Sequence, residues 1–69
     1  MKLSARNVLK GRIVHVQKGA TTAHVRIELI GGAIVTASIT NEAVDELQLA
    51  AGNEAYAVIK ASDVMIARD

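Results

Sequence analysis

Residues Thr21–Thr40 read TTAHVRIELIGGAIVTASIT, and this stretch decides the fold. Its first half alternates, so that four apolar side chains share one face of an extended chain: Ala23, Val25, Ile27 and Leu29. Alternation with a period of two predicts a half-buried strand. Gly31-Gly32 then favours a tight reversal into AIVTASIT, which is rich in β-branched residues. The stretch therefore predicts a β-hairpin.

The segments on either side extend this pattern. Asn7–Gly19 (NVLKGRIVHVQKG) also alternates and predicts a strand before the hairpin. Thr40–Gly52 (TNEAVDELQLAAG) changes to helical spacing, with Thr40 or Asn41 available as N-cap and Gly52 as the stop. Asn53–Arg68 (NEAYAVIKASDVMIAR) returns to strand chemistry, as two segments or as one strand that bends near residues 61–63.

The order strand, strand, strand, helix, strand, strand predicts an all-β fold with one short helix. Three consecutive strands followed by a bridging helix and a final pair are typical of a five-stranded OB-like Greek-key barrel. The chain has 69 residues and no linker-like segment, so we expect residues 1–69 to form a single domain.

The size and composition favour self-association. A 69-residue chain is near the lower limit for a self-sufficient core, and the absence of Cys excludes disulfides. Yet 51% of the residues are hydrophobic, more than so short a chain can hide within itself. No apolar run is long enough to cross a membrane, and the N-terminus lacks the apolar core of a signal peptide, so we expect a soluble cytoplasmic protein without a membrane partner.

The charges are unevenly distributed along the chain. Residues 1–27 carry six bases and no acid, whereas residues 28–69 carry two bases and seven acids. This division fits an anion-binding N-terminal half, basic surfaces that meet acidic surfaces of other subunits, or ordinary solvated charge. It also leaves open a non-enzymatic module that docks on a protein or a nucleic acid through its basic half. The single aromatic residue, Tyr56, and the net charge of +1 argue against nucleic acid.

Enzymatic and metal-dependent functions have little support in the sequence. His15 and His24 lie on predicted strands without Cys or an acidic cluster nearby, and their spacing does not fit a metal site. No arrangement of Ser, His and Asp can be argued for nucleophilic catalysis. We therefore expect neither an enzyme nor a cation site.

Two short segments concentrate hydrogen-bond donors. Ser4–Asn7 (SARN) places a hydroxyl, a guanidinium and an amide together, with no carboxylate within twenty residues. Lys60 and Ser62 lie two residues apart, on one face of an extended chain. Donors without carboxylates suit a fully deprotonated tetrahedral oxyanion, because such a dianion accepts hydrogen bonds on every oxygen and donates none. Lys60 alternatively reaches solvent or pairs with Glu54 or Asp63.

A third segment, Lys18–Ala23 (KGATTA), allows two interpretations. It is either a plain hairpin loop or a nest whose backbone N–H groups bind an anion.

The motifs as a whole resemble one known family. MKLSARNVLKG at the start and SITNEAVDELQLAAGNEAYAVIKASDVMI toward the end resemble the molbindins, the small cytoplasmic molybdate-binding proteins built on the Mop, or TOBE, domain. The resemblance covers nearly the whole chain. It implies an OB-like barrel that forms a homohexamer, a trimer of dimers, and binds molybdate or tungstate between subunits. Since the chain has only this domain, storage or buffering of the anion is the implied role.

The resemblance also implies which residues bind the anion. The family motif carries over to eight positions of this chain: Ser4, Ala5, Arg6, Asn7, Thr40, Lys60, Ala61 and Ser62. A serine is common in the family three residues after Thr40, where this chain has Ala43. Gly19, Thr22 and Ala23 correspond to a segment that would form a second anion site, although an asparagine often stands where this chain has Thr22.

The family was also described as binding a molybdenum pterin. No aromatic wall is available here to stack a pterin, so we favour the free oxyanion as ligand and expect no cofactor.

Overall fold

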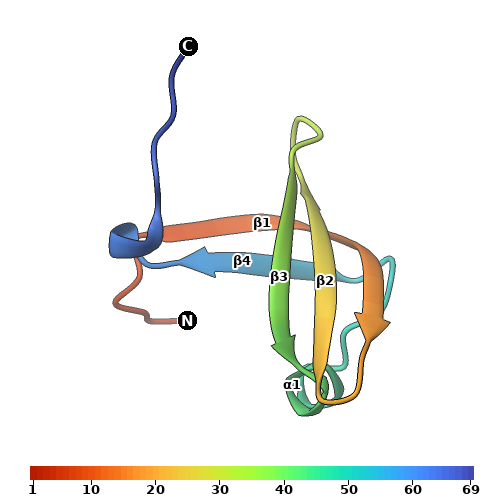
Figure 1. The fold of residues 1–69 in the computed structure, drawn as a ribbon. Helices are drawn as coiled ribbons and strands as arrows, with labels where there is room; N and C mark the ends of the chain where they lie inside the picture. The colour runs from red at the N-terminus through yellow and green to blue at the C-terminus, as the bar shows by residue number, and fades with distance from the viewer.

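A computed structural model describes all 69 residues as one curled antiparallel sheet with a short helix at one end (Figure 1). The elements are β1 (Asn7–Lys18), β2 (Thr22–Leu29), β3 (Ile34–Thr40), α1 (Asn41–Glu46) and β4 (Glu54–Ile59), followed by a 3₁₀ turn, η1 (Ala61–Asp63). The spatial order of the strands is β3-β2-β1-β4. The all-β fold with one short helix is therefore confirmed.

The long strand β1 holds the sheet together by pairing with different partners along its length. Its first half, Asn7–Arg12, pairs with β4, and its second half, from Gly11 onward, pairs with β2. A β-bulge shifts the β1–β2 register between Ile13 and His15. Bulges bend a strand and increase its twist, and β1 accordingly turns, so that the half beside β2 runs in a different direction from the half beside β4 (Figure 1).

The core is small and lies inside the curl. Only five residues are buried, four from the strands and one from α1: Ile13, Ala23, Val25, Ile27 and Val44. The three from β2 belong to the apolar face that the alternation predicts. Val44 covers one end of this core from the helix.

The predicted turns are correct, but the predicted helix end is wrong. Gly31 and Gly32 adopt φ values of 96° and 95°, the left-handed region that favours glycine. Thr40 caps α1 as predicted. The helix, however, ends at Glu46 with Leu47 as its C-cap, because Gln48 takes a left-handed conformation with a φ of 53°. Gly52 instead forms a later turn, where its N–H donates to the carbonyl of Ile13.

The expected fifth strand is absent from the sheet, so the five-stranded barrel is not closed within one chain. The predicted bend near residues 61–63 is present as η1, but residues 64–69, here called the C-terminal tail, leave the sheet (Figure 1). Met65 and Ile66 are 92% and 89% exposed. The tail does not pair with a strand of its own chain. An extended segment without a neighbouring strand has no partner for its backbone N–H and C=O groups.

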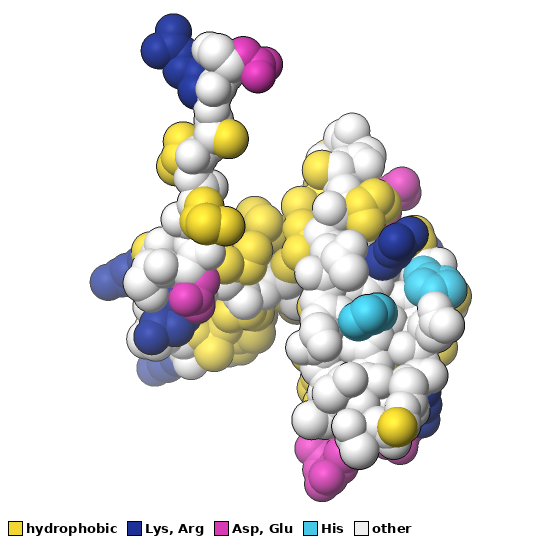
Figure 2. Space-filling view, viewed as in Figure 1, with side chains coloured by type: hydrophobic (Ala, Val, Ile, Leu, Met, Phe, Trp, Pro, Cys, Tyr) yellow, Lys and Arg dark blue, Asp and Glu magenta, His cyan; other side chains and the backbone are white.

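An apolar groove of about 740 Å³ lies where a closing strand would pack. β3, β4 and the segment after α1 line it, for example through Val35, Ala57 and Leu49. Figure 2 shows apolar side chains along the tail and also between the end of the molecule formed by β1 and β4 and the hairpin formed by β2 and β3. None of the helices is long and apolar enough to cross a membrane.

Gly11 provides a test of the bent sheet. A Cβ atom at this position would lie 2.5 Å from the Glu28 carbonyl oxygen and 2.8 Å from the Ile27 side chain. We expect Gly11→Val to lower the free energy of unfolding by about 1–3 kcal/mol, measured by urea denaturation, because overpacking forces the strands apart. Ser38→Val, which puts the same side chain on an exposed strand position, is the control and should change stability by no more than about 0.5 kcal/mol.

Candidate functional site

The first predicted site forms at the start of β1 and the end of β4, and we call its residues, Ser4–Asn7 and Lys60–Ser62, the amino-terminal cluster. Asn7 and Ile59 are paired residues of β1 and β4, and the Asn7 side-chain amide donates to the Ile59 carbonyl at 3.1 Å. Arg6 precedes one member of this pair and Lys60 follows the other. The two predicted segments, more than fifty residues apart in sequence, therefore lie together (Figure 1).

The donors of this cluster have no acceptor within the chain. The two ion pairs of the structure are Lys10–Glu54 and Lys18–Asp45, so neither Arg6 nor Lys60 is paired. Glu54, one of the acids considered for Lys60, lies 3.5 Å from Lys10 instead. The hydroxyls of Ser4 and Ser62 make no hydrogen bond either. The charge and the hydroxyls thus remain available to a ligand.

Backbone N–H groups add to these donors. The 3₁₀ turn bonds the Asp63 N–H to the Lys60 carbonyl and the Val64 N–H to the Ala61 carbonyl, but leaves the N–H groups of Ala61 and Ser62 unused. The same is true of the irregular segment before β1, where the N–H groups of Ala5 and Arg6 make no backbone bond. These N–H groups are therefore further donors that are available to an anion.

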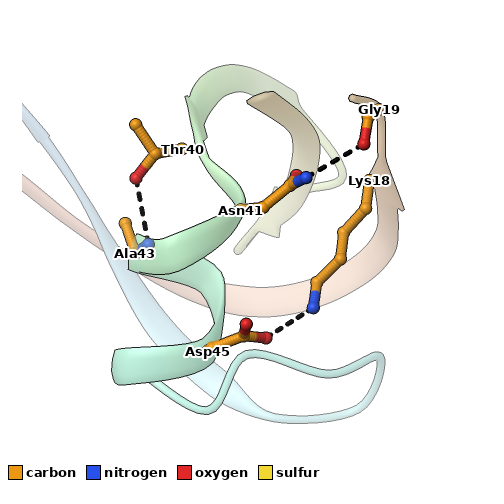
Figure 3. Close-up of polar contacts among 6 residues, drawn as sticks. All are labelled: Lys18, Gly19, Thr40, Asn41, Ala43 and Asp45. Atoms are coloured by element: carbon orange, nitrogen blue, oxygen red, sulfur yellow. Dashed lines mark hydrogen bonds and ion pairs between the residues drawn. The ribbon is translucent and has the colours of Figure 1, made fainter. Parts of the chain in front are cut away.

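The other predicted site residues lie at the opposite end of β1, where the β1–β2 turn meets α1 (Figure 3). We call Lys18–Thr22 with Thr40, Asn41 and Asp45 the turn cluster. The Asn41 side chain donates to the Gly19 carbonyl at 2.9 Å, and its backbone N–H donates to the Thr21 carbonyl at 2.9 Å. Lys18 forms an ion pair with Asp45 across the start of the helix. These contacts fasten the turn to α1.

Thr40 belongs to the turn cluster and not to the amino-terminal cluster of the same chain. It pairs with Thr22 across β2 and β3, and its hydroxyl oxygen accepts a hydrogen bond of 3.0 Å from the Ala43 N–H as the helix cap. Within one subunit, Thr40 is therefore at the far end of β1 from Arg6 and Lys60. Ala23 is only 1% exposed, so its side chain belongs to the core and cannot touch a ligand.

Sequence reasoning missed the roles of Asn41 and Asp45 at this end. From the sequence, Asn41 is expected only as an alternative helix cap, and no contact is predicted for Asp45. Their contacts span 22 and 27 residues. Since both contacts join segments that are distant in sequence, no short-range pattern predicts them.

Comparisons with known proteins identify the family of the chain. The model of the TOBE domain matches residues 3–66. The chain belongs to the TOBE domain family. It is 47% identical over 66 residues to a probable molybdenum-pterin-binding protein of Haemophilus influenzae, with 96% of both chains covered. It is 48% identical to molybdenum-pterin-binding protein 3 of Clostridium pasteurianum, covering 96% of this chain and 97% of the relative. The resemblance to the Mop proteins is therefore confirmed.

Solved TOBE structures share the fold. MopII from Clostridium pasteurianum superposes with a TM-score of 0.91 at 45% identity, covering 97% of this chain and all of that chain. A molybdate-binding protein from Sporomusa ovata gives 0.92 at 29% identity, with 99% of this chain and all of that chain covered. The cytoplasmic molybdate-binding protein ModG, solved with molybdate bound, gives 0.91 at 48% identity, and the match covers 94% of this chain but 46% of ModG.

The cap role of Thr40 generates a prediction. Thr40→Ala removes the acceptor of the Ala43 N–H, so we expect a loss of about 1 kcal/mol in the free energy of unfolding, measured by thermal or urea denaturation without any anion. Thr40→Ser keeps the hydroxyl and serves as the control. Equal stability of the alanine variant and the wild type would contradict the cap.

Proposed function

We propose that this protein binds molybdate or tungstate as the free oxyanion and acts as a cytoplasmic store or buffer for it. The carrying observation is the amino-terminal cluster, in which the segments that bear Arg6 and Lys60 lie side by side and neither cation is paired with a carboxylate. Two of the similar solved structures are named molybdate-binding proteins, one of them cytoplasmic, which supports the same ligand.

The donor set accounts for the binding chemistry. Arg6 and Lys60 neutralise the two negative charges of the dianion, while the hydroxyls of Ser4 and Ser62 and the nearby N–H groups fill its remaining lone pairs. Each charge-assisted hydrogen bond contributes about 1.5–3 kcal/mol. An anion that keeps a proton carries less charge for Arg6 and Lys60 to neutralise and finds no carboxylate among these groups to accept that proton, so it is disfavoured. The proposed activity is binding alone, without a catalytic step or a resident cofactor.

We place the complete site between subunits. The amino-terminal cluster of one chain lies on the surface at the end of two strands, and Thr40, the remaining residue of the family motif, is at the other end of β1. A second copy that brings its turn cluster to the amino-terminal cluster would supply Thr40 and exclude water. Exclusion of water strengthens every charged contact to the anion.

The tail and the groove support a homo-oligomer. The C-terminal tail presents Val64, Met65 and Ile66 to solvent, and the groove between β3 and β4 exposes an apolar lining of its own. Insertion of the tail of a second copy would cover both surfaces and give each subunit its fifth strand. This completes the predicted OB-like barrel across the interface and is compatible with a trimer of dimers.

The alternative function, docking on a protein or nucleic acid through the basic half, has less support. Lys10 and Lys18 are already paired with acids of the same chain, so the basic half is not one continuous positive surface. Tyr56 is the only aromatic residue available for stacking on bases.

Titration calorimetry tests the anion site. We expect heat of binding with molybdate, and affinity lower by roughly tenfold or more for Arg6→Ala and for Lys60→Ala, since each variant loses at least one charge-assisted contact. Arg26→Ala is the matched control, because Arg26 is exposed on β2 and makes no ion pair. Equal binding of sulfate by the wild type, or no heat with molybdate, would refute the proposed ligand.

A single substitution in the tail tests the assembly. Ile66→Asp puts a charge where the tail would enter the groove, and we expect it to reduce the particle mass measured by light scattering. Ile30→Asp places the same charge on the β2–β3 turn, at a residue that is 95% exposed and does not line the groove, and should leave the mass unchanged. A wild-type protein that is monomeric at micromolar concentration would contradict the assembly.

A further inference from the structure

One part of the sheet carries apolar side chains on both of its faces, namely the two-stranded ribbon that residues 7–12 of β1 form with β4. Directly opposed residues of an antiparallel pair share a face, and successive pairs alternate between the two faces. Leu9 opposes Ala57, which packs against the core, so this pair lies on the inner face. The neighbouring pair, Val8 and Val58, therefore lies on the outer face.

The outer face of the ribbon is apolar at its centre and open to solvent. Val8, Val58 and Tyr56 are 41%, 46% and 52% exposed. Lys10 opposes Tyr56, and its Nζ lies 3.5 Å from a carboxylate oxygen of Glu54, which follows on the same face. We call these five residues the outer ribbon face.

The hairpin half of the same sheet shows what a solvated face looks like in this chain. On β2 and β3 the outward side chains are polar, with His24 opposite Ser38 and Arg26 opposite Thr36. An antiparallel sheet with one face in water normally alternates between apolar residues inside and polar residues outside. The hairpin follows this rule and the ribbon does not, so the outer ribbon face has the composition of a covered surface.

Insertion of a tail into the apolar groove would not cover this surface. Val8 and Lys10 do not line the groove, because they lie on the opposite face of the ribbon from Leu9. A two-stranded ribbon is at best marginally stable in water without packing on its faces. The outer ribbon face therefore needs a partner other than the tail.

The charges around this face favour a copy of the same chain as that partner. Lys10 is neutralised by Glu54, and Arg12, at the end of the ribbon, donates to the Gly52 carbonyl at 3.2 Å. A nucleic acid would need free cations, and a strongly charged protein would need a surface of the opposite sign. One cation and one anion beside an apolar centre are instead self-complementary, since Lys10 of each copy is able to meet Glu54 of the other across a two-fold axis.

We propose that the outer ribbon face packs against the same face of a second copy about a two-fold axis. The inference rests on the homo-oligomer of the proposed function, and it assigns to that oligomer a contact that is separate from the tail and the groove. A chain with two separate self-association surfaces forms an assembly of more than two subunits. The contact also covers the ribbon, which no other part of its own chain does.

Particle mass, measured by light scattering without any anion, tests this contact. We expect Val8→Asp to give a smaller particle than the wild type, because it would bury an unpaired charge in an apolar interface. Ser38→Asp is the matched control, since Ser38 is exposed on the outward side of β3 and does not line the groove, and it should leave the mass unchanged. Val8→Asp combined with Ile66→Asp should be monomeric. A Val8→Asp particle with the mass of the wild type would overturn the proposal.

Tyr56 gives a second readout on the same surface. It is the only tyrosine of a chain without tryptophan or phenylalanine, so the intrinsic fluorescence reports on this face alone. With Ile66→Asp present to disable the tail, we expect acrylamide to quench Tyr56 more strongly after adding Val8→Asp than after adding Ser38→Asp. Val8→Thr keeps the β-branched shape but places a hydroxyl in the contact, and should act in the same direction without disturbing the strand.

Equal quenching of the Val8 and Ser38 variants would overturn the proposal. The proposed function fails separately, if Ile66→Asp leaves the particle mass unchanged or if molybdate gives no heat of binding. In either case the response of Tyr56 to the Val8 substitutions still decides whether the outer ribbon face is an interface.

Discussion

The bend in β1 is the constraint on which the rest of the structure depends. One strand pairs with β4 through its first half and with β2 through its second, and both sets of pairs meet at Gly11, where no side chain fits. The bulge after Ile13 turns the second half inward, so that Val25 and Ile27 can be covered from α1. Because both ends of this strand carry polar clusters, its curvature also determines the separation between them.

Local patterns predicted the parts of the fold that depend on neighbouring residues. The alternation of β2, the glycine pair before β3 and the hydroxyl of Thr40 each act within a few residues, so the sequence shows them directly. The fifth strand was predicted because residues 64–66 are of types that are common in strands. A strand also needs the free edge of another strand to pair with, and a sequence pattern does not show where that edge lies. The sequence also predicted that both segments of the amino-terminal cluster supply hydrogen-bond donors. It did not predict that Thr40 lies at the other end of β1, because that position depends on the path of the whole chain.

The uneven charge distribution also has a clearer meaning in the folded chain. Of the bases in the first 27 residues, Lys10 and Lys18 neutralise Glu54 and Asp45 from the acidic half, whereas Arg6 keeps its charge free. The charge separation along the sequence is therefore partly cancelled by folding. The two ends of β1 then differ: Arg6 and Lys60 at one end pair with no carboxylate, whereas Lys18 at the other end is paired with Asp45.

The small core would make the stability of the chain depend on its concentration if the proposed association occurs. Only five residues are buried, so a single chain is expected to have a low free energy of unfolding. The edge strand β3 has no charged residue, proline or bulge that would prevent it from pairing with another chain. In a self-associating protein, folding and association then share one equilibrium, and mass action sets the folded fraction. Dilution would act on such a protein as a mild denaturant, and the cellular concentration of the chain would regulate its lifetime.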